Sequence, residues 1–195
     1  MKNENREACA TIRGYNYQFD ATITAILELS GEDTLVIEGL EDFDINRSNS
    51  SDLFQCKYYA AQKLTNSVLR DAVLPMLKDF VSRDRKNGFD RIYHLYGYFK
   101  ESTLTQETVT PETLKKCLVT KERSNEPSTK AEYTTINIQE KIGVSDEDIE
   151  IFSRRLRLHF CAEYIEHRNN VIDNLRKAYS VSKHEAELYL YPSAF

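Results

Sequence analysis

The sequence predicts an α/β fold in which a helix, three strands, a second helix and a fourth strand are followed by a helical C-terminal extension. One observation is the helical spacing of apolar residues in two segments, 15–29 and 64–89. The other is a set of short runs rich in β-branched and aromatic residues, at 34–40, 53–59 and 91–99. Because both patterns alternate along one chain, we expect helices to pack on a shared sheet.

The first helix is expected over 15–29, YNYQFDATITAILEL, after a leader at 1–12 and a turn at Gly14. The turn-forming residues SGED end it. The next segment, TLVIEGL at 34–40, has the character of a buried strand, and residues 42–45 either continue it or begin the second strand.

The third strand is LFQCKYY, at 53–59, and the polar stretch before it, 46–52, is expected to form a hairpin loop. The fourth strand is RIYHLYGYF, at 91–99. Because a helix separates the third and fourth strands, we expect them to pair in parallel through a right-handed crossover.

The helix between these strands lies within 64–89. Thr65 or Asn66 is expected to cap its N-terminus, and Asn87-Gly88 to end it. Pro75 falls inside the apolar pattern, so it predicts a kink or an early break.

The C-terminal part is expected to hold a short helix at 110–119, with Thr110 as its cap and Pro111 at its first position. The polar stretch 121–132 predicts a flexible loop. Two longer helices are expected next, at 144–160 and 162–180.

Ser145 and Asp148 have the spacing of a capping box at the start of the first of these helices, with Asp in the usual place of Glu. A further helix is expected from Ser182. Because the chain stops soon after that residue, we expect it to be the N-terminal part of a longer polypeptide.

The composition is that of a globular protein, with 41% hydrophobic and 29% charged residues. Its 195 residues suffice for one domain, alone or with a helical extension. The net charge of −5 argues against a general nucleic-acid coating protein, which would be basic. It does not argue against an enzyme that meets nucleic acid at a metal site, because the bound ion reverses the local field.

The four cysteines, Cys9, Cys56, Cys117 and Cys161, are far apart and form no CxxC pair. The sequence therefore supports neither a zinc knuckle nor a thioredoxin-type site, and a reduced, cytoplasmic protein is expected. No apolar run approaches the roughly 20 residues that span a bilayer, and the start lacks the apolar middle of a signal peptide. We expect no membrane partner.

The chemistry is expected where carboxylates face an amide and an ammonium group across two strands. If 38–44 is extended, Glu38, Asp42 and Asp44 share one face. Gln55 and Lys57 share one face of the next strand. Carboxylates gathered this closely repel one another unless a cation neutralises them, and their hard oxygens suit Mg²⁺ or Mn²⁺.

This arrangement resembles the PD-(D/E)xK nucleases, whose restriction-endonuclease-like core is a helix, a three-strand meander, a helix and a strand. Asp44 is similar to the family's second-strand acid, Gln55-Cys56-Lys57 to its (D/E)xK signature, and Gln18 to its first-helix polar residue. The segments IRGYNYQFDATITAI, IEGLEDFDI, LFQCKYY and DEDIEIFSRRL resemble more closely the nuclease domain of anti-phage effectors. These are the double-stranded-DNA endonucleases of cyclic-oligonucleotide (CBASS) systems and the nuclease subunit of Lamassu-type systems.

The resemblance covers most of the chain and implies a Mg²⁺- or Mn²⁺-dependent endonuclease that hydrolyses double-stranded DNA. Asp44, Gln55 and the backbone carbonyl of Cys56 would hold the metal ion. Lys57 would act with Asp44 and Gln55 as the third catalytic residue. Gln18, Glu38 and Asp42 would be accessory site residues, and Lys63 and Arg70 could contact the phosphate backbone.

The resemblance also implies a nuclease core at 1–120 and, at 121–195, a loop and helical extension that packs on the core and leads to a sensor domain or a partner subunit. Activation would occur by formation of a homo-oligomer. The glutamine at the acid position makes one metal ligand neutral, so two interpretations stay open. The chain could be an active enzyme in which Glu38, Asp42 or Gln18 helps to bind the metal ion. It could instead be an inactive DNA-binding or assembly module of the same fold.

Several residues keep alternative interpretations. The sequence does not decide whether Asp42 or Asp44 is the main metal ligand. Lys57 could extend from a half-buried strand without a catalytic task, Gln18 could face solvent, and Glu41 is expected to be a turn acid. An RNA-cutting enzyme also stays open, since no residue pattern reads a 2′-hydroxyl.

The histidines predict no site. His94 is expected to pack in or beside a strand, and His159, His167 and His184 are expected on helices without metal-ligand spacing. The Cys56 thiol is expected to point into the core as a small apolar group.

Overall fold

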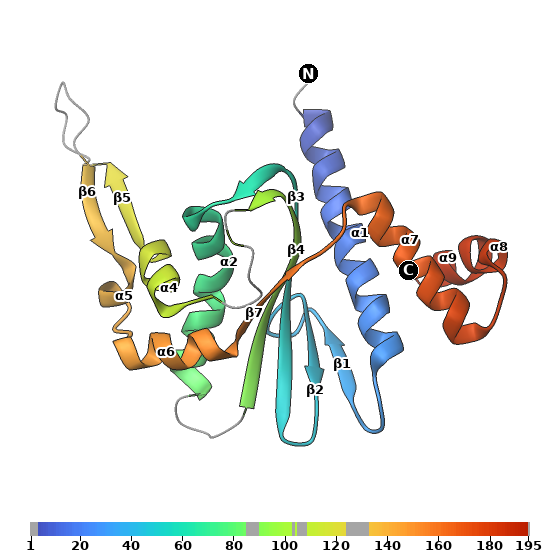
Figure 1. The fold of residues 1–195 in the computed structure, drawn as a ribbon, viewed down its shortest axis with the longest axis horizontal. Coiled ribbons are helices and arrows are strands. Elements are labelled where there is room, and N and C mark those ends of the chain that lie inside the picture. Colours follow the sequence, from blue (N-terminus) through green and yellow to red (C-terminus); the bar gives the residue numbers. More distant parts are fainter. Residues whose placement is uncertain (1–3, 85–89, 103, 105–108, 124–132, 195) are drawn as a thin grey trace.

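The chain is an α/β protein built around one mixed sheet. The computed structural model describes residues 4–84, 90–102, 104, 109–123 and 133–194. Within these residues the main sheet has five strands in the order β1-β2-β3-β4-β7 (Figure 1). The strands are β1 Thr34–Ile37, β2 Phe43–Asn46, β3 Ser50–Leu64, β4 Asp90–Ser102 and β7 Leu156–Phe160. The predicted α/β class is confirmed.

The sheet is antiparallel on one side of β3 and parallel on the other. β1 pairs with β2, and β2 with β3, in antiparallel register. β3 pairs with β4 in parallel, and β4 pairs with β7 in parallel. The parallel pairing expected for the third and fourth strands is therefore confirmed.

Helices cover both faces of the sheet. α1 (Glu4–Glu28) and α7 (Tyr164–Tyr179) lie on one side, and α2 (Asn66–Asp79), α4 (Pro111–Cys117) and α6 (Asp146–Arg155) on the other (Figure 1). Alternation along β3 serves both layers, because Leu53 belongs to the apolar core with α2 and Cys56 to the core with α1. The burial expected for the Cys56 thiol is confirmed.

The N-terminal elements differ from the predictions in their bounds. α1 begins at Glu4, so the expected leader is wrong and Gly14 lies inside the helix. Residues 9–13 are exposed, so this part of the helix has no apolar face toward the core, and such a face is the pattern that predicts a helix. Residues 42–45 were expected either to continue the first strand or to begin the second. The structure shows the second alternative, because Phe43–Asn46 forms the separate strand β2.

β1 is an edge strand rather than a buried one. It ends at Ile37, and Val36 and Ile37 are 44% and 46% exposed. The prediction of a buried strand over 34–40 is wrong, because an apolar run does not show whether the strand has one neighbour or two.

The start of α2 is as predicted. The Thr65 side chain accepts a hydrogen bond from the backbone N–H of Val68, which identifies Thr65 as the cap. The helix runs through Pro75 to Asp79, so the early break is wrong, and a π-helical turn, η1 (Phe80–Asp84), follows. The predicted end at Asn87-Gly88 lies outside the described residues.

The helix predicted at 144–160 is wrong in its second half. The capping box of Ser145 and Asp148 is confirmed, but α6 ends at Arg155 and Leu156–Phe160 forms β7. Leu156 and Leu158 are buried on the sheet, which is the two-residue period of a strand.

A small hairpin, β5 (Val119–Arg123) with β6 (Tyr133–Asn137), follows the short helix α4 and leads into α5 (Ile138–Lys141). The Thr110 cap and the Pro111 helix start are confirmed. The predicted loop at 121–132 is wrong for 121–123, which belong to β5, and its remainder lies outside the described residues.

The C-terminal helices pack on α1. α7 is followed by α8 (Lys183–Glu185), η2 (Ala186–Leu190) and α9 (Tyr191–Ser193), and Ser182 caps α8 as expected. Ile23 of α1 forms a buried cluster with apolar residues of α7, η2 and α9.

Because β7 adds a strand to the main sheet, the expectation of a purely helical extension after 120 is wrong. Across the part of the chain that the structure describes, no helix combines the length and apolar character needed to cross a bilayer.

Candidate functional site

The five-residue loop between β1 and β2 is folded by Asp44. Its carboxylate accepts hydrogen bonds from the backbone N–H of Leu40, at 2.7 Å, and of Glu41, at 3.3 Å. The loop also needs a left-handed residue, Glu38, with φ 54°. A Cβ on Gly39 would lie 2.2 Å from Oδ2 of Asp44, so only glycine fits there.

Asp44 is therefore enclosed by backbone. It is 6% exposed. Burial raises its pKa, and the hydrogen bonds from Leu40 and Glu41 offset only part of this effect. Its two oxygens hold the hairpin loop together.

Asp42, two residues earlier, contacts the strand that carries the predicted signature. Its Oδ2 accepts hydrogen bonds from Nε2 of Gln55, at 3.0 Å, and from the backbone N–H of Cys56, at 2.6 Å. The second bond is available because β3 continues beyond the start of β2, which leaves this N–H at a free strand edge. Asp42 and Gln55 are thus brought together, as the sequence predicted for an acid and the amide.

Gln18 joins these residues from α1. Its Nε2 donates to Oε1 of Glu38, at 3.0 Å, and to the backbone carbonyl of Asp42, at 3.3 Å. The side chain is 9% exposed, so the alternative of a solvent-facing Gln18 is wrong. The helix thereby fixes the position of the loop that carries Asp42.

Lys57 and Asp42 line one open hollow of about 290 Å³, together with Gln18. Its remaining walls come from α1 and β3: Thr11, Gly14, Tyr15, Cys56, Tyr58 and Tyr59. Asp44 is not among the lining residues. Of the two candidate acids, Asp42 is the one that reaches the hollow, and this hollow is the candidate site.

Glu41 lies in the loop between β1 and β2, so the turn position expected for it is confirmed, and it does not line the hollow. Burial raises its pKa to about 7, and the neighbouring charges of Asp42 and Asp44 raise it further, whereas Lys57 lowers it. A carboxyl group with this pKa can accept or release a proton near neutral pH.

Asp42, Gln55 and Cys56 offer the types of oxygen atom that bind divalent cations. Asp42 offers a carboxylate, Gln55 an amide oxygen and Cys56 a carbonyl, which are hard oxygen ligands. Among the described residues no three His, Cys, Asp or Glu side chains are arranged around a common ion position, so backbone and amide oxygens would have to complete the set.

Lys63 and Arg70, the expected phosphate contacts, lie elsewhere. Lys63 forms an ion pair with Glu101, and Arg70 with Asp71 at 3.1 Å. Neither residue lines the hollow.

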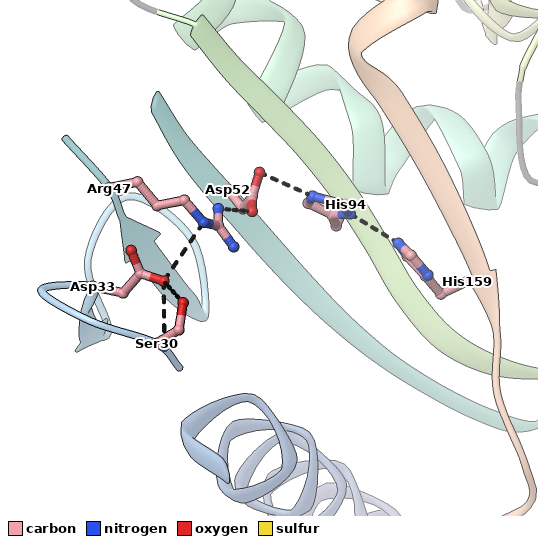
Figure 2. A network of polar contacts seen from close by, with 6 residues as sticks. All are labelled: Ser30, Asp33, Arg47, Asp52, His94 and His159. Carbon is pink, nitrogen blue, oxygen red and sulfur yellow. Dashed lines mark hydrogen bonds and ion pairs between the residues drawn. The ribbon is translucent and has the colours of Figure 1, made fainter. Parts of the chain in front are cut away.

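A second polar cluster crosses the sheet away from the hollow (Figure 2). His94 of β4 and His159 of β7 share a hydrogen bond of 2.8 Å between Nδ1 and Nε2. The expected place of His94 in a strand is confirmed, and the helical place expected for His159 is wrong.

The cluster continues through carboxylates and one arginine. Nε2 of His94 lies 3.5 Å from Asp52 of β3, and Asp52 pairs with Arg47, which also approaches Asp33 at 3.8 Å (Figure 2). Burial favours a higher pKa for Asp52, but its hydrogen bonds to His94 and Arg47 outweigh this and lower it. These contacts link neighbouring strands and stabilise the strand register, although Nε2 of His94 is buried and reaches Asp52 only at 3.5 Å.

Gly97 of β4 supports Lys57 from the neighbouring strand, and this gives a testable prediction. A Cβ at Gly97 would lie 2.5 Å from the carbonyl oxygen of Lys57, which is backbone and cannot rotate away. We expect Gly97→Ala to separate β4 from β3 at this point and to lower the free energy of unfolding by at least about 1 kcal/mol.

The measurement is urea unfolding followed by circular dichroism. The matched control is Gly14→Ala, because a Cβ at this helical position meets nothing within 4 Å. We expect the control to be neutral or stabilising. Equal stability of Gly97→Ala and wild type would contradict the close approach.

Comparison of the chain with protein-family models, curated proteins and solved structures gave no significant match.

Proposed function

We propose that this chain is a divalent-metal-dependent endonuclease that hydrolyses phosphodiester bonds in double-stranded DNA. The observation that carries the proposal is the position of Asp42, bound to Gln55 and to the backbone of Cys56 on the hollow that Lys57 lines. The element order and the change from antiparallel to parallel pairing at β3 support it, because they agree with the restriction-endonuclease-like core that the sequence resembles.

The proposal gives the main acidic role to Asp42 and a structural role to Asp44. Asp42, the amide oxygen of Gln55 and the carbonyl of Cys56 would hold Mg²⁺ or Mn²⁺. Gln55 now directs Nε2 toward Asp42, so its amide would rotate to present oxygen. When bound, the ion would stabilise charge on the phosphate and acidify a water molecule.

The other residues act on charge and on the position of the loop. Lys57 offsets the negative charge that develops on the phosphate. The proton released from the attacking water can pass to solvent, because the hollow is open. Gln18 keeps Glu38 and the loop of Asp42 in place.

The biological role proposed with this activity is that of an anti-phage effector in the cytoplasm. Such a nuclease needs restraint, and a sensor domain or partner subunit that assembles the chain into an oligomer would supply it. The support for this role is the sequence resemblance.

The second candidate function is an inactive DNA-binding or assembly module with the same fold. One observation favours it: Oδ2 of Asp42 already accepts two hydrogen bonds from protein donors. In this case the acid–amide pair would be a structural link between β2 and β3.

Supercoiled plasmid separates the two functions. Wild type with Mg²⁺ or Mn²⁺ is expected to nick and linearise the plasmid, and EDTA is expected to stop the reaction. Lys57→Ala should lower the rate at least about 100-fold because it removes a charge that acts on the transition state. Plasmid binding without cleavage, unchanged in Lys57→Ala, would favour the module.

The assay is run with the chain alone and with the chain fused to a dimerising coiled coil, so that a need for assembly is covered. A single-stranded RNA substrate in parallel tests the nucleic-acid class. Faster cleavage of RNA than of DNA would contradict the proposed substrate.

A further inference from the structure

A second and larger hollow continues from the candidate site. It has a volume of about 560 Å³ and lies between the first half of α1 and the last part of β3. It shares Tyr58 and Tyr59 with the hollow of Asp42 and Lys57. The two hollows therefore adjoin, and Asp42 and Lys57 line the smaller one.

The shape of β3 opens this second hollow. The pairing of β3 with β4 shifts register between Tyr59 and Lys63, which is a bulge or irregularity in the strand. The exposed residues Ala60 and Ala61 lie in this interval and line the hollow. Bulges redirect side chains at the margins of sheets and occur next to active sites.

The lining is apolar and aromatic with one cation. Ala10, Ala60 and Ala61 provide small apolar walls beside the ring of Tyr58, whereas the ring of Tyr59 lies on the other face of the sheet against Phe99. Arg13 is the one positively charged residue among those that line this hollow in the described part of the chain. An apolar wall with an aromatic ring and a single cation matches a nucleobase joined to a phosphate.

The rings are held in place. The Tyr58 hydroxyl donates to Oε1 of Glu163 at 2.9 Å, and its ring lies 5.2 Å from Tyr17. The Tyr59 ring lies 5.7 Å from Phe99. Burial, followed by Glu163, raises the pKa of Tyr58 to about 12, and the nearby charge of Arg13 opposes this. Fixed rings can stack on a base at a small entropic cost.

The size of the hollow selects the state of the nucleic acid. Its volume is within the range of about 300–1,000 Å³ that small-molecule pockets have. A base pair inside a duplex keeps both faces stacked and cannot enter such a hollow, whereas a base separated from its partner can.

We propose that the second hollow is a subsite for one unpaired nucleotide next to the phosphate that is cleaved. The base would stack against Tyr58 beside the alanine wall, and Arg13 would bind the adjoining phosphate. This inference rests on the proposed function, and it makes locally opened DNA the preferred substrate: duplex with a bulge, a mismatch or a splayed end.

The test is binding without catalysis. Fluorescence anisotropy in EDTA compares a labelled matched duplex with the same duplex carrying a three-nucleotide bulge. Wild type is expected to bind the bulged duplex at least about fivefold more tightly, since one base–aromatic stack contributes roughly 1–3 kcal/mol. Ala61→Phe, which fills the hollow from an exposed position, should reduce this preference to less than twofold.

Arg13→Gln should weaken binding of the bulged duplex more than that of the matched duplex, because only an unpaired nucleotide in the hollow brings its phosphate to Arg13. Lys63→Gln, which alters an exposed cation outside the hollow, is the matched control and should leave the preference unchanged. Circular dichroism confirms that each variant is folded.

Equal affinity of wild type for both duplexes, or a preference that survives Ala61→Phe, would overturn the subsite. Because no metal ion is present in this assay, the result does not depend on cleavage. A preference for bulged DNA in a protein that never cuts plasmid would uphold the subsite and reject the nuclease.

Discussion

Asp42→Asn is expected to reduce DNA cleavage about 1,000-fold while the protein stays as stable as wild type. The asparagine keeps an oxygen that can accept from Gln55 and from the Cys56 N–H, so the link between β2 and β3 is retained. It removes the negative charge that faces Lys57 across the hollow. Cleavage of supercoiled plasmid and urea unfolding measure the two effects separately.

Asp44→Asn is expected to show the opposite pattern. Both carboxylate oxygens of Asp44 accept backbone N–H groups, from Leu40 and Glu41. Asparagine has one acceptor, and its amide nitrogen would face an N–H group in a buried position. We expect the free energy of unfolding to fall by about 1–3 kcal/mol, with cleavage by the folded protein largely kept.

The two variants form a matched pair, since each removes one charge from the same short segment. Loss of cleavage at full stability in Asp44→Asn, with an active Asp42→Asn, would return the catalytic role to Asp44. Loss of cleavage in both, with no change in stability, would mean that both acids act in the reaction. Either result would contradict the separation of roles that the hydrogen bonds indicate.

The sequence could predict that an acid would meet Gln55, but not which acid would line the hollow with Lys57. Residues two apart on a strand share a face, so Asp42 and Asp44 are equivalent by pattern. They differ because β2 begins at Phe43, which leaves Asp42 in the loop beside the free edge of β3. The length of one strand relative to its neighbour is a tertiary feature and leaves no local signal.

Local signals were reliable where one short segment decides the outcome. The caps at Thr65, Thr110 and Ser145 depend on hydrogen bonds that span three residues, and all three are present. β7 was missed because its five residues follow a helix directly, and what makes them a strand is pairing with β4, some sixty residues earlier. The pairing of His94 with His159 has the same origin.

Stability at mildly acidic pH offers a test of how the C-terminal helices are attached to α1. Asp20 of α1 is 0% exposed, and its Oδ1 accepts a hydrogen bond of 2.8 Å from the Tyr191 hydroxyl of α9. The Arg168 guanidinium of α7 lies over the Tyr191 ring at 4.9 Å. Burial raises the pKa of Asp20 to about 6, although Tyr191 and Arg168 both lower it.

The sign of the pH effect follows from this raised pKa. The folded protein binds the Asp20 proton more tightly than the unfolded chain does, so this proton stabilises the fold. The stabilisation is complete below the ordinary pKa of 3.8 and is lost as pH rises through about 6. Between pH 7.5 and pH 4.5, wild type should gain about 2 kcal/mol of unfolding free energy relative to Asp20→Asn, which cannot titrate.

Urea unfolding of wild type and Asp20→Asn at both pH values measures this difference, and other titrating groups cancel because the two proteins share them. Glu187→Gln is the matched control, since it removes an exposed carboxyl group of η2 on the same C-terminal segment and shows what that loss alone does at the two pH values. If the difference in unfolding free energy between wild type and Asp20→Asn is the same at both pH values, Asp20 is ionised at both. The carboxylate would then stabilise the contact of α1 with α9 as a charge balanced by Arg168, and acidification would weaken that contact.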